Sequence, residues 1–419
     1  MKKTIFIIFI MCSCIDTIHA GGFSFAEHGA AAVGKAFAFT GEANDPSAIF
    51  YNAAGIAELP GTQVMFGTAV ARLSNHFESS ITPEADDLEK HLPAIPHFYI
   101  THQFKNWDDR FYFGFGIYHP FGLRVDWPDN WQGRFAIKDA SLRATVLNPT
   151  LAFRPNNKLA IAGGLQILDS AVKLRQSFSV PGLVPESDII INDLSGRSLG
   201  WNAGLLYHLT EATTFGVNIR SQLVTHYKGQ VNFAGPGSAF FESTNVDSTI
   251  TYPPYVFFGF STQISSRWKL NGDLGYFKWS TVKSLPFNFE STSGSAIPQS
   301  ALNLSVDQSW KNSYVYSVGT EYALTERLVF RGGLFVDESA IPGWTFDPTT
   351  PVSTLRGGTI GVGYKWSNMV FDAAYLEGGY KGQTIDSSTT NILNLAGNTT
   401  FGTYKGKVQV LTLSFRLKF

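Results

Sequence analysis

Residues Gly29 to Phe37, GAAAVGKAF, have the composition of a phosphate-binding loop, in which glycine N–H groups and a lysine contact phosphate. A Walker A loop also needs Ser or Thr after the lysine to hold magnesium, whereas Ala36 follows Lys35 here. It further needs a buried strand before it, within a βαβ unit, and the sequence shows neither. The stretch therefore does not predict nucleotide binding, and its glycines and alanines require another explanation.

The remaining chemistry-bearing residues form no recognisable catalytic or metal-binding motif. Nucleophilic catalysis needs a Ser or Asp positioned beside a His, and metal sites need closely spaced ligands. The histidines are scattered without such spacing: His76, His97, His102, His119, His208 and His226. We therefore expect no catalytic residue, no metal and no cofactor.

The composition is unusual for a soluble α/β enzyme. The 419 residues are 44% hydrophobic, 14% aromatic and only 16% charged, and they include 40 glycines. A formal net charge of −1 gives no basic excess that would favour nucleic acid. Abundant aromatic residues together with abundant glycine are typical of a β-protein with exposed aromatic belts.

The first twenty residues are expected to be a signal peptide. Lys2 and Lys3 precede a short apolar run, Ile5 to Met11, and Ala20 ends a plausible cleavage site. Both cysteines lie in this segment, so the mature chain is expected to contain no disulfide. A lipoprotein interpretation of Cys14 is weak, because the residues before it make a poor lipobox.

Beyond this segment no run of 18 apolar residues occurs, so the sequence predicts no transmembrane helix. The dominant pattern instead has a period of two, which indicates strands with one apolar and one polar face. The clearest case is LTLSFRLKF: one face carries Leu411, Leu413, Phe415, Leu417 and Phe419, and the other carries Thr412, Ser414, Arg416 and Lys418. An aromatic residue at the end of such a strand, here Phe419, resembles the signal that bacterial barrel-assembly machinery reads.

The connections between strands alternate between short turns and long loops, which include Arg124–Ser141 and Pro181–Gly196. This layout is typical of outer-membrane barrels. A soluble β-sandwich is disfavoured, because the polar faces are rich in Gly, Asn and charged residues while the apolar faces end in Trp and Tyr. We therefore predict an all-β fold: a 14-stranded antiparallel transmembrane barrel over residues 61–419. A monomer in the outer membrane of a Gram-negative bacterium is expected.

Residues 21–60 precede the first strand and resemble the N-terminal hatch of the FadL family of outer-membrane transporters for long-chain fatty acids and other hydrophobic compounds. The resemblance includes the GF-x-x-x-E start and the Asn-Pro-Ala-[GA] turn, which reads Asn52-Ala53-Ala54-Gly55 here, with Ala in place of Pro. Later segments, such as Phe330–Gly343, match as well. The resemblance implies that residues 21–60 are a plug inside the barrel lumen, and that the Asn52–Gly55 turn belongs to the gate.

The family resemblance also implies a lateral route. In the family the hatch kinks the third strand, and the ligand leaves sideways through the barrel wall into the membrane. In this sequence Pro120 removes a ladder hydrogen-bond donor and Gly122 permits a bulge, and Gly122 matches the kink glycine of the family. For the ligand carboxylate, the matching positions are Lys311 and Arg175. The expected partners are a long-chain fatty acid or other hydrophobic ligand, outer-membrane lipid and lipopolysaccharide.

Alternatives remain open at this point. Aromatic hydrocarbons such as toluene are a second substrate class within the family, and no residue pattern separates the two classes. A general porin would use facing acidic and basic clusters and would lack a forty-residue hatch. An enzyme barrel, such as an outer-membrane phospholipase or protease, would need a positioned catalytic set.

Overall fold

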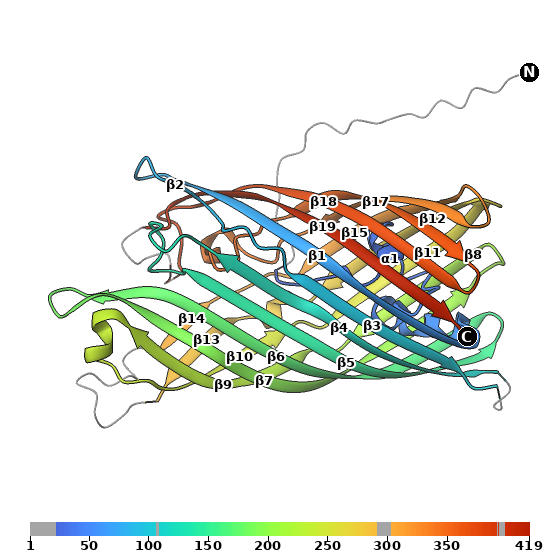
Figure 1. The fold of residues 1–419 in the computed structure, drawn as a ribbon, viewed down its shortest axis with the longest axis horizontal. Helices are drawn as coiled ribbons and strands as arrows, with labels where there is room; N and C mark the ends of the chain where they lie inside the picture. Colours follow the sequence, from blue (N-terminus) through green and yellow to red (C-terminus); the bar gives the residue numbers. More distant parts are fainter. Residues whose placement is uncertain (1–21, 106–108, 291–302, 392, 394–398) are drawn as a thin grey trace, which may run out of the picture.

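The chain folds into one antiparallel β-sheet that closes into a barrel (Figure 1). The computed structural model describes residues 22–105, 109–290, 303–391, 393 and 399–419. The first strand, β1 (Thr62–Ser79), pairs with the last, β19 (Gly402–Lys418), along their full lengths, and this pairing closes the sheet. The expected signal peptide, residues 1–20, lies outside the described residues.

The elements follow one another along the chain with few helices. The short helices are α1 (Ala30–Val33), α2 (Ala48–Tyr51) and the 3₁₀ helices η1 (Ala53–Glu58), η2 (Gly235–Ala239), η3 (Trp279–Thr281) and η5 (Gly343–Thr345). Between β1 and β19 lie β2 (Ala85–Asp87), β3 (Ala94–Gln103), β4 (Phe111–Asp126), β5 (Asp139–Asn156), β6 (Leu159–Val180), β7 (Val184–His208), β8 (Thr213–Arg220), β9 (Leu223–Ala234), β10 (Thr244–Tyr252), β11 (Tyr255–Ser265), β12 (Trp268–Phe277), β13 (Ser284–Phe289), β14 (Leu304–Asp307), β15 (Ser313–Ala323), β16 (Leu328–Asp337), β17 (Leu355–Trp366) and β18 (Met369–Ile385).

The predicted number of fourteen strands is wrong, because the closed barrel has sixteen, and the whole sheet formed by the described residues has nineteen. Segments that the sequence pattern presents as continuous are interrupted. Pro253 and Pro254 separate β10 from β11, since proline has no N–H to donate to a ladder. Between β8 and β9, the Ser221 hydroxyl accepts a hydrogen bond from the Trp201 N–H at 2.9 Å, in place of a regular backbone partner.

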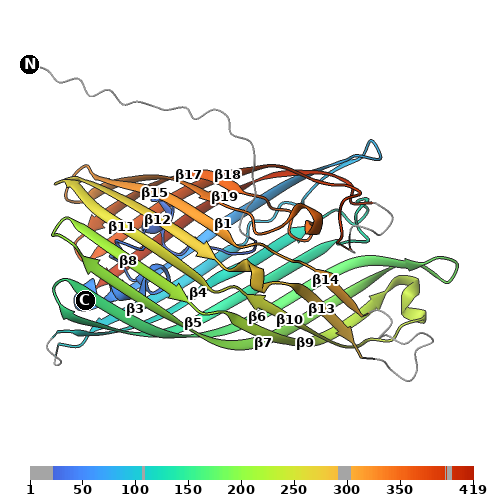
Figure 2. The same cartoon turned by 180° about the vertical axis from the view of Figure 1, so that it is seen from behind.

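A second correction concerns the loop predicted at Pro181–Gly196. This region is a turn followed by strand, because β6 and β7 stay paired as far as Val180 and Val184. The distal part of β7 also pairs with β9, with Ile189 opposite Phe233. In the sequence alone, isoleucines surrounded by polar residues suggest a loop. In the structure Ile189, Ile190 and Ile191 pair with β6 on one side and with β9 on the other. Figure 2 shows the far side of the barrel, where β13 and β14 pair toward the same end.

The outer face of the barrel is apolar, as the alternation predicts. On β19, Leu411 and Leu413 are exposed, whereas the intervening Thr412 and the following Ser414 are buried. Other strands likewise expose large apolar residues, including Leu151, Leu165, Leu199, Val318, Leu334 and Ile360. Exposed aromatic residues lie next to short turns, among them Tyr207, Trp268, Tyr322 and Trp366. This is the surface of a lipid-embedded barrel with an aromatic girdle. Among the described residues, no helix is long and apolar enough to cross a bilayer.

The N-terminal segment, residues 22–60, is almost completely buried against strands around the barrel. Glycines of the wall allow this close approach. A Cβ at Gly216 of β8 would lie 2.0 Å from the Thr40 carbonyl oxygen, and one at Gly319 of β15 would lie 2.2 Å from that of Lys35. The Ala30 N–H donates to the hydroxyl of Ser414 on β19 at 2.9 Å. The prediction that this segment closes the lumen as a plug is taken further as a proposal below.

Lys35, the lysine of the phosphate-loop-like stretch, is part of a buried charge network. Its ammonium group pairs with Glu42, which also accepts hydrogen bonds from Lys269 at 2.6 Å and Asn271 at 2.5 Å, both on β12. Burial alone would raise the pKa of Glu42, but the two lysines hold that pKa below its ordinary value. The Glu42 carboxylate attaches the N-terminal segment to β12 through two donors on that strand, Lys269 and Asn271.

We expect Glu42→Gln to destabilise the folded protein by about 3 kcal/mol, because it removes the buried carboxylate that pairs directly with both Lys35 and Lys269. The measurement is the temperature at which the folded band converts to the unfolded band in heat-modifiable gel migration. Glu78→Gln is the matched control: Glu78 is exposed, pairs with Lys405 at 2.8 Å, and should change this temperature little. Equal shifts for the two variants would contradict the assignment.

Candidate functional site

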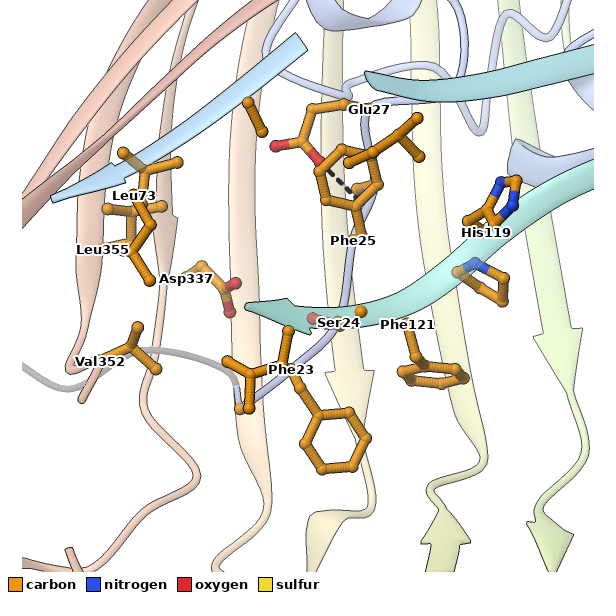
Figure 3. A pocket seen from close by; sticks show the side chains of 18 of the residues that line it. Phe23, Ser24, Phe25, Glu27, Leu73, His119, Phe121, Asp337, Val352 and Leu355 are labelled. Carbon is orange, nitrogen blue, oxygen red and sulfur yellow. Dashed lines mark hydrogen bonds between the residues drawn. The ribbon is translucent and has the colours of Figure 1, made fainter. Parts of the chain in front are cut away.

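A cavity of about 620 Å³ lies between the N-terminal segment and the barrel wall (Figure 3). Its lining is largely apolar and aromatic. The N-terminal segment contributes Phe23 and Phe25, and β4 contributes Phe121. The remaining apolar side chains come from strands across the barrel and include Leu73, Phe257, Phe277, Val315, Phe335, Leu355 and Val408. Such a lining suits the burial of a hydrophobic molecule, because each buried CH₂ contributes about 0.8 kcal/mol.

The barrel wall has a break beside this cavity. The β3–β4 ladder ends at the pair Phe98–Ile117, so the distal part of β4 has no regular partner on its β3 side. On its other side, β4 has a bulge between Tyr118 and Phe121, where the register with β5 shifts. Pro120 lies within this bulge and lacks an N–H, so it cannot continue a ladder.

Two backbone hydrogen bonds, which together form one isolated antiparallel bridge, replace part of the missing ladder. The Phe25 N–H donates to the Pro120 carbonyl at 2.8 Å, and the Gly122 N–H donates to the Phe23 carbonyl at 3.0 Å. Between them Ser24 and Phe121 form an isolated antiparallel bridge. Across the break, the His119 imidazole donates from Nδ1 to the Pro96 carbonyl at 3.0 Å. The N-terminal segment therefore pairs with β4 at the position where β3 does not.

Arg220, the last residue of β8, connects the N-terminal segment to the strand with the bulge. Its guanidinium is buried and donates to the Tyr118 hydroxyl at 2.5 Å and to Gln166 at 2.7 Å. It also donates to the carbonyls of Ile49 and Phe50 in α2, each at 2.8 Å. Carbonyls in a short helix carry partial negative charge, so they are suitable acceptors for a buried cation without a carboxylate.

The predicted gate turn, Asn52 to Gly55, packs against β7. The Asn52 side chain donates to the carbonyls of Thr40 at 2.8 Å and Leu205 at 3.0 Å, and accepts from the Ala54 N–H at 3.2 Å. Ala53 and Ala54 are buried. Gly55 has no room for a side chain, because a Cβ there would lie 2.2 Å from the Ala43 carbonyl oxygen.

The structure places Pro120 and Gly122 at the cavity, but not Lys311 or Arg175. Pro120 and Gly122, both on β4, line the cavity beside the break. The Lys311 ammonium instead lies 4.5 Å from the centre of the Trp344 ring. The Arg175 guanidinium contacts Asp129 and Asp139, each at 2.7 Å. Neither cation lines the cavity, so the geometry lends no support to their predicted carboxylate contacts, which stay predictions.

The sequence pattern missed several charged residues that do line the cavity. They are Glu27, Arg72, Glu89, His91, His119, Arg124, Asp126, Arg143 and Asp337. They are far apart in the sequence and belong to the N-terminal segment, four strands and one loop. Glu27 is distinctive, because burial raises its pKa to about 7 even though the Ala26 N–H donates to its carboxylate at 2.9 Å.

Comparison with known proteins identifies the family. A family model described as "Outer membrane protein transport protein (OMPP1/FadL/TodX)" matches residues 12–419. The chain belongs to this FadL/TodX family. It is therefore an outer-membrane transport protein of a family that moves hydrophobic compounds. The break beside β4 and the apolar cavity are features of this FadL/TodX chain that bear on transport.

Individual relatives of the FadL/TodX chain are distant in sequence but similar over most of their length. The "Long-chain fatty acid transport protein" of Salmonella typhi is 22% identical over 355 residues, which cover 77% of this chain and 79% of the relative. The crystal structure of a Pseudomonas aeruginosa FadL homologue gives a TM-score of 0.78 at 20% identity and covers 95% of this chain and all of that chain. The Ralstonia pickettii toluene transporter TbuX gives 0.71 at 16% identity, with 94% and 99% covered. The two structures support the fold.

The raised pKa of Glu27 predicts that the stability of the folded protein depends on pH. Its folded-state pKa of about 7 lies above the ordinary value of 4.5, so folded protein retains a proton that unfolded protein releases. Stability should therefore fall as pH rises from about 4.5 to about 7, by about 3 kcal/mol, and stay low above that range. Glu27→Gln should remove this fall, which thermal unfolding of both proteins between pH 4 and pH 8 would detect. Parallel pH curves for the two proteins would show that Glu27 is not the cause.

The hydrogen bonds of Arg220 predict that this residue couples the N-terminal segment to β4. Arg220→Met should cost about 3 kcal/mol, because it removes charge-assisted hydrogen bonds and leaves the Ile49 and Phe50 carbonyls unpaired. We expect faster proteolysis within residues 22–60 while the barrel stays folded. Arg267→Met, at the exposed turn between β11 and β12, is the control. Identical cleavage rates for both variants would be evidence against the coupling.

Proposed function

We propose that this protein takes up long-chain fatty acids passively, with the ligand bound in the cavity and released sideways through the break between β3 and β4. No ion gradient or ATP is available at the outer membrane, so transport relies on diffusion through a gated route. In this proposal, residues 22–60 act as a plug that closes the lumen to water-soluble molecules. The burial of that segment and its contacts with strands around the barrel support the plug.

The observation that carries the proposal is the cavity that adjoins the unpaired part of β4. An apolar cavity gives an acyl chain a favourable environment that a water-filled pore does not. Cavity-lining residues lie on both sides of the break, with Pro96 on β3 and Gly122 on β4. A hydrophobic ligand could therefore pass from the cavity into the membrane without crossing the periplasmic end of the barrel.

Two alternatives remain within reach of experiment. The same cavity and break would suit a neutral aromatic hydrocarbon such as toluene, and similar structures include toluene transporters. A general porin is disfavoured by the apolar side chains of the cavity lining and by the buried N-terminal segment.

The test is uptake of labelled oleate and labelled toluene by cells that lack their own transporter and express this chain. Gly122→Phe should reduce uptake at least about fivefold, because the new ring occupies the break. The substitution should be compatible with the fold, since the nearest atom to a Cβ at Gly122 is the Leu142 carbonyl oxygen at 3.6 Å. Gly163→Phe is the matched control on β6, where a Cβ meets its nearest atom at 3.9 Å.

Each outcome separates the candidates. Oleate uptake that Gly122→Phe blocks and Gly163→Phe preserves would support the lateral fatty-acid route. Uptake of toluene alone would keep the route and change the substrate class. Entry of small sugars without oleate or toluene would favour the general porin. Equal loss in both glycine variants would remove the case for the break as the exit.

A further inference from the structure

The arginines that line the cavity lie together, with the acids Glu89 and Asp126 near them. These arginines, Arg72 on β1, Arg124 on β4 and Arg143 on β5, lie at the outer rim of the break. Arg72 occupies the opposite face of its strand from buried Ala69, and Arg143 the opposite face from buried Ala144. Arg124 and Arg143 are exposed and Arg72 is half-buried. These three side chains therefore belong to the outward face of the wall.

The interior of the cavity differs from this rim. The charged residues there are Glu27 of the N-terminal segment and Asp337 on β16, both acidic, and Figure 3 shows both beside the apolar lining. Among the described residues, no lysine or arginine from the inner wall lines the cavity. A carboxylate placed deep in the cavity would lose its hydration beside two acidic side chains, without a cation from the described inner wall to replace it.

Two of the rim arginines are available for a ligand. Arg124 contacts Asp126 at 3.4 Å, and that aspartate also pairs with His91 at 2.8 Å. Arg72 and Arg143, by contrast, have no ion pair and no side-chain hydrogen bond within the described part of the chain. The other titratable groups at this rim are Glu89 and His119, and the His119 ring is held by the Pro96 carbonyl.

We propose that Arg72 and Arg143 bind the carboxylate of an amphiphilic ligand at the outer rim of the break, while its acyl chain occupies the aromatic cavity. This inference rests on the proposed function and identifies two residues that select an anionic substrate over a neutral one. Guanidinium groups suit this role, because they bind carboxylates through paired, charge-assisted hydrogen bonds. A neutral hydrocarbon gains nothing from these two residues, so the rim favours the anionic substrate over toluene.

The experiment compares oleate with oleyl alcohol, which has the same chain without the charge. Uptake of each is measured against concentration in cells that express the wild-type chain or the double variant Arg72→Gln/Arg143→Gln. The half-saturating oleate concentration should rise about tenfold in the variant, and that of oleyl alcohol should change less than about twofold. Arg72→Lys/Arg143→Lys should restore only part of the oleate uptake, because the charges remain but the paired hydrogen bonds of the guanidinium groups are lost.

Arg197→Gln is the control for the loss of an outward-facing arginine. Arg197 lies on β7, is 82% exposed in its side chain, pairs with Asp169 at 2.8 Å and does not line the cavity. Heat-modifiable migration verifies that every variant is folded. Both side chains point outward with no internal partner, so the double variant is expected to fold.

The outcomes are distinct. A loss restricted to oleate, with wild-type uptake of oleyl alcohol, supports the carboxylate site. Equal losses for both ligands, or no loss for either, overturn it while leaving the lateral route intact. Wild-type cells that take up neither ligand faster than control cells overturn the proposed function and this inference with it.

Discussion

A chain in the hydrocarbon region of a membrane has to provide a hydrogen-bond partner for each backbone N–H and C=O group, since lipid tails offer none. The pairing of β1 with β19 meets this requirement by removing the free edges of the sheet. The distal part of β4 is the exception, because its ladder with β3 stops at Phe98–Ile117. Backbone groups of Phe23 and Phe25 fill part of the gap, so the integrity of the wall depends on the N-terminal segment.

The same constraint explains why the N-terminal segment is so firmly attached. Glu42 connects it to β12, Asn52 connects it to β7, and Arg220 connects it to both β8 and β4. Each attachment uses a polar side chain that is buried and has hydrogen-bond partners. A segment held at several points around the barrel can support the weak point in the wall while leaving a cavity beside it.

Much of the architecture follows from local sequence patterns. Period-two alternation in segments such as Leu411–Phe419 predicts which side chains face lipid, and the exposed leucines of β19 agree with it. The strand count does not follow, because interruptions at Ser221 and at Pro253–Pro254 depend on local hydrogen bonds that alternation does not encode. The loop predicted at Pro181–Gly196 fails for a related reason, since it becomes strand only through its pairing with β9.

The sequence by itself determined the class of protein, because alternating faces and aromatic residues beside short turns each have a local physical cause. Tertiary structure decided the site. Glu27, Arg72 and Arg143 have no motif in common and come from distant parts of the chain, and they line one cavity because the sheet closes and the N-terminal segment lies against it. Lys311 and Arg175 are predicted from matching positions in the sequence. Such a match cannot reveal that Lys311 lies against the Trp344 ring, or that Arg175 pairs with two aspartates. Local patterns record which face a residue occupies, but the partner of a charge depends on the whole fold.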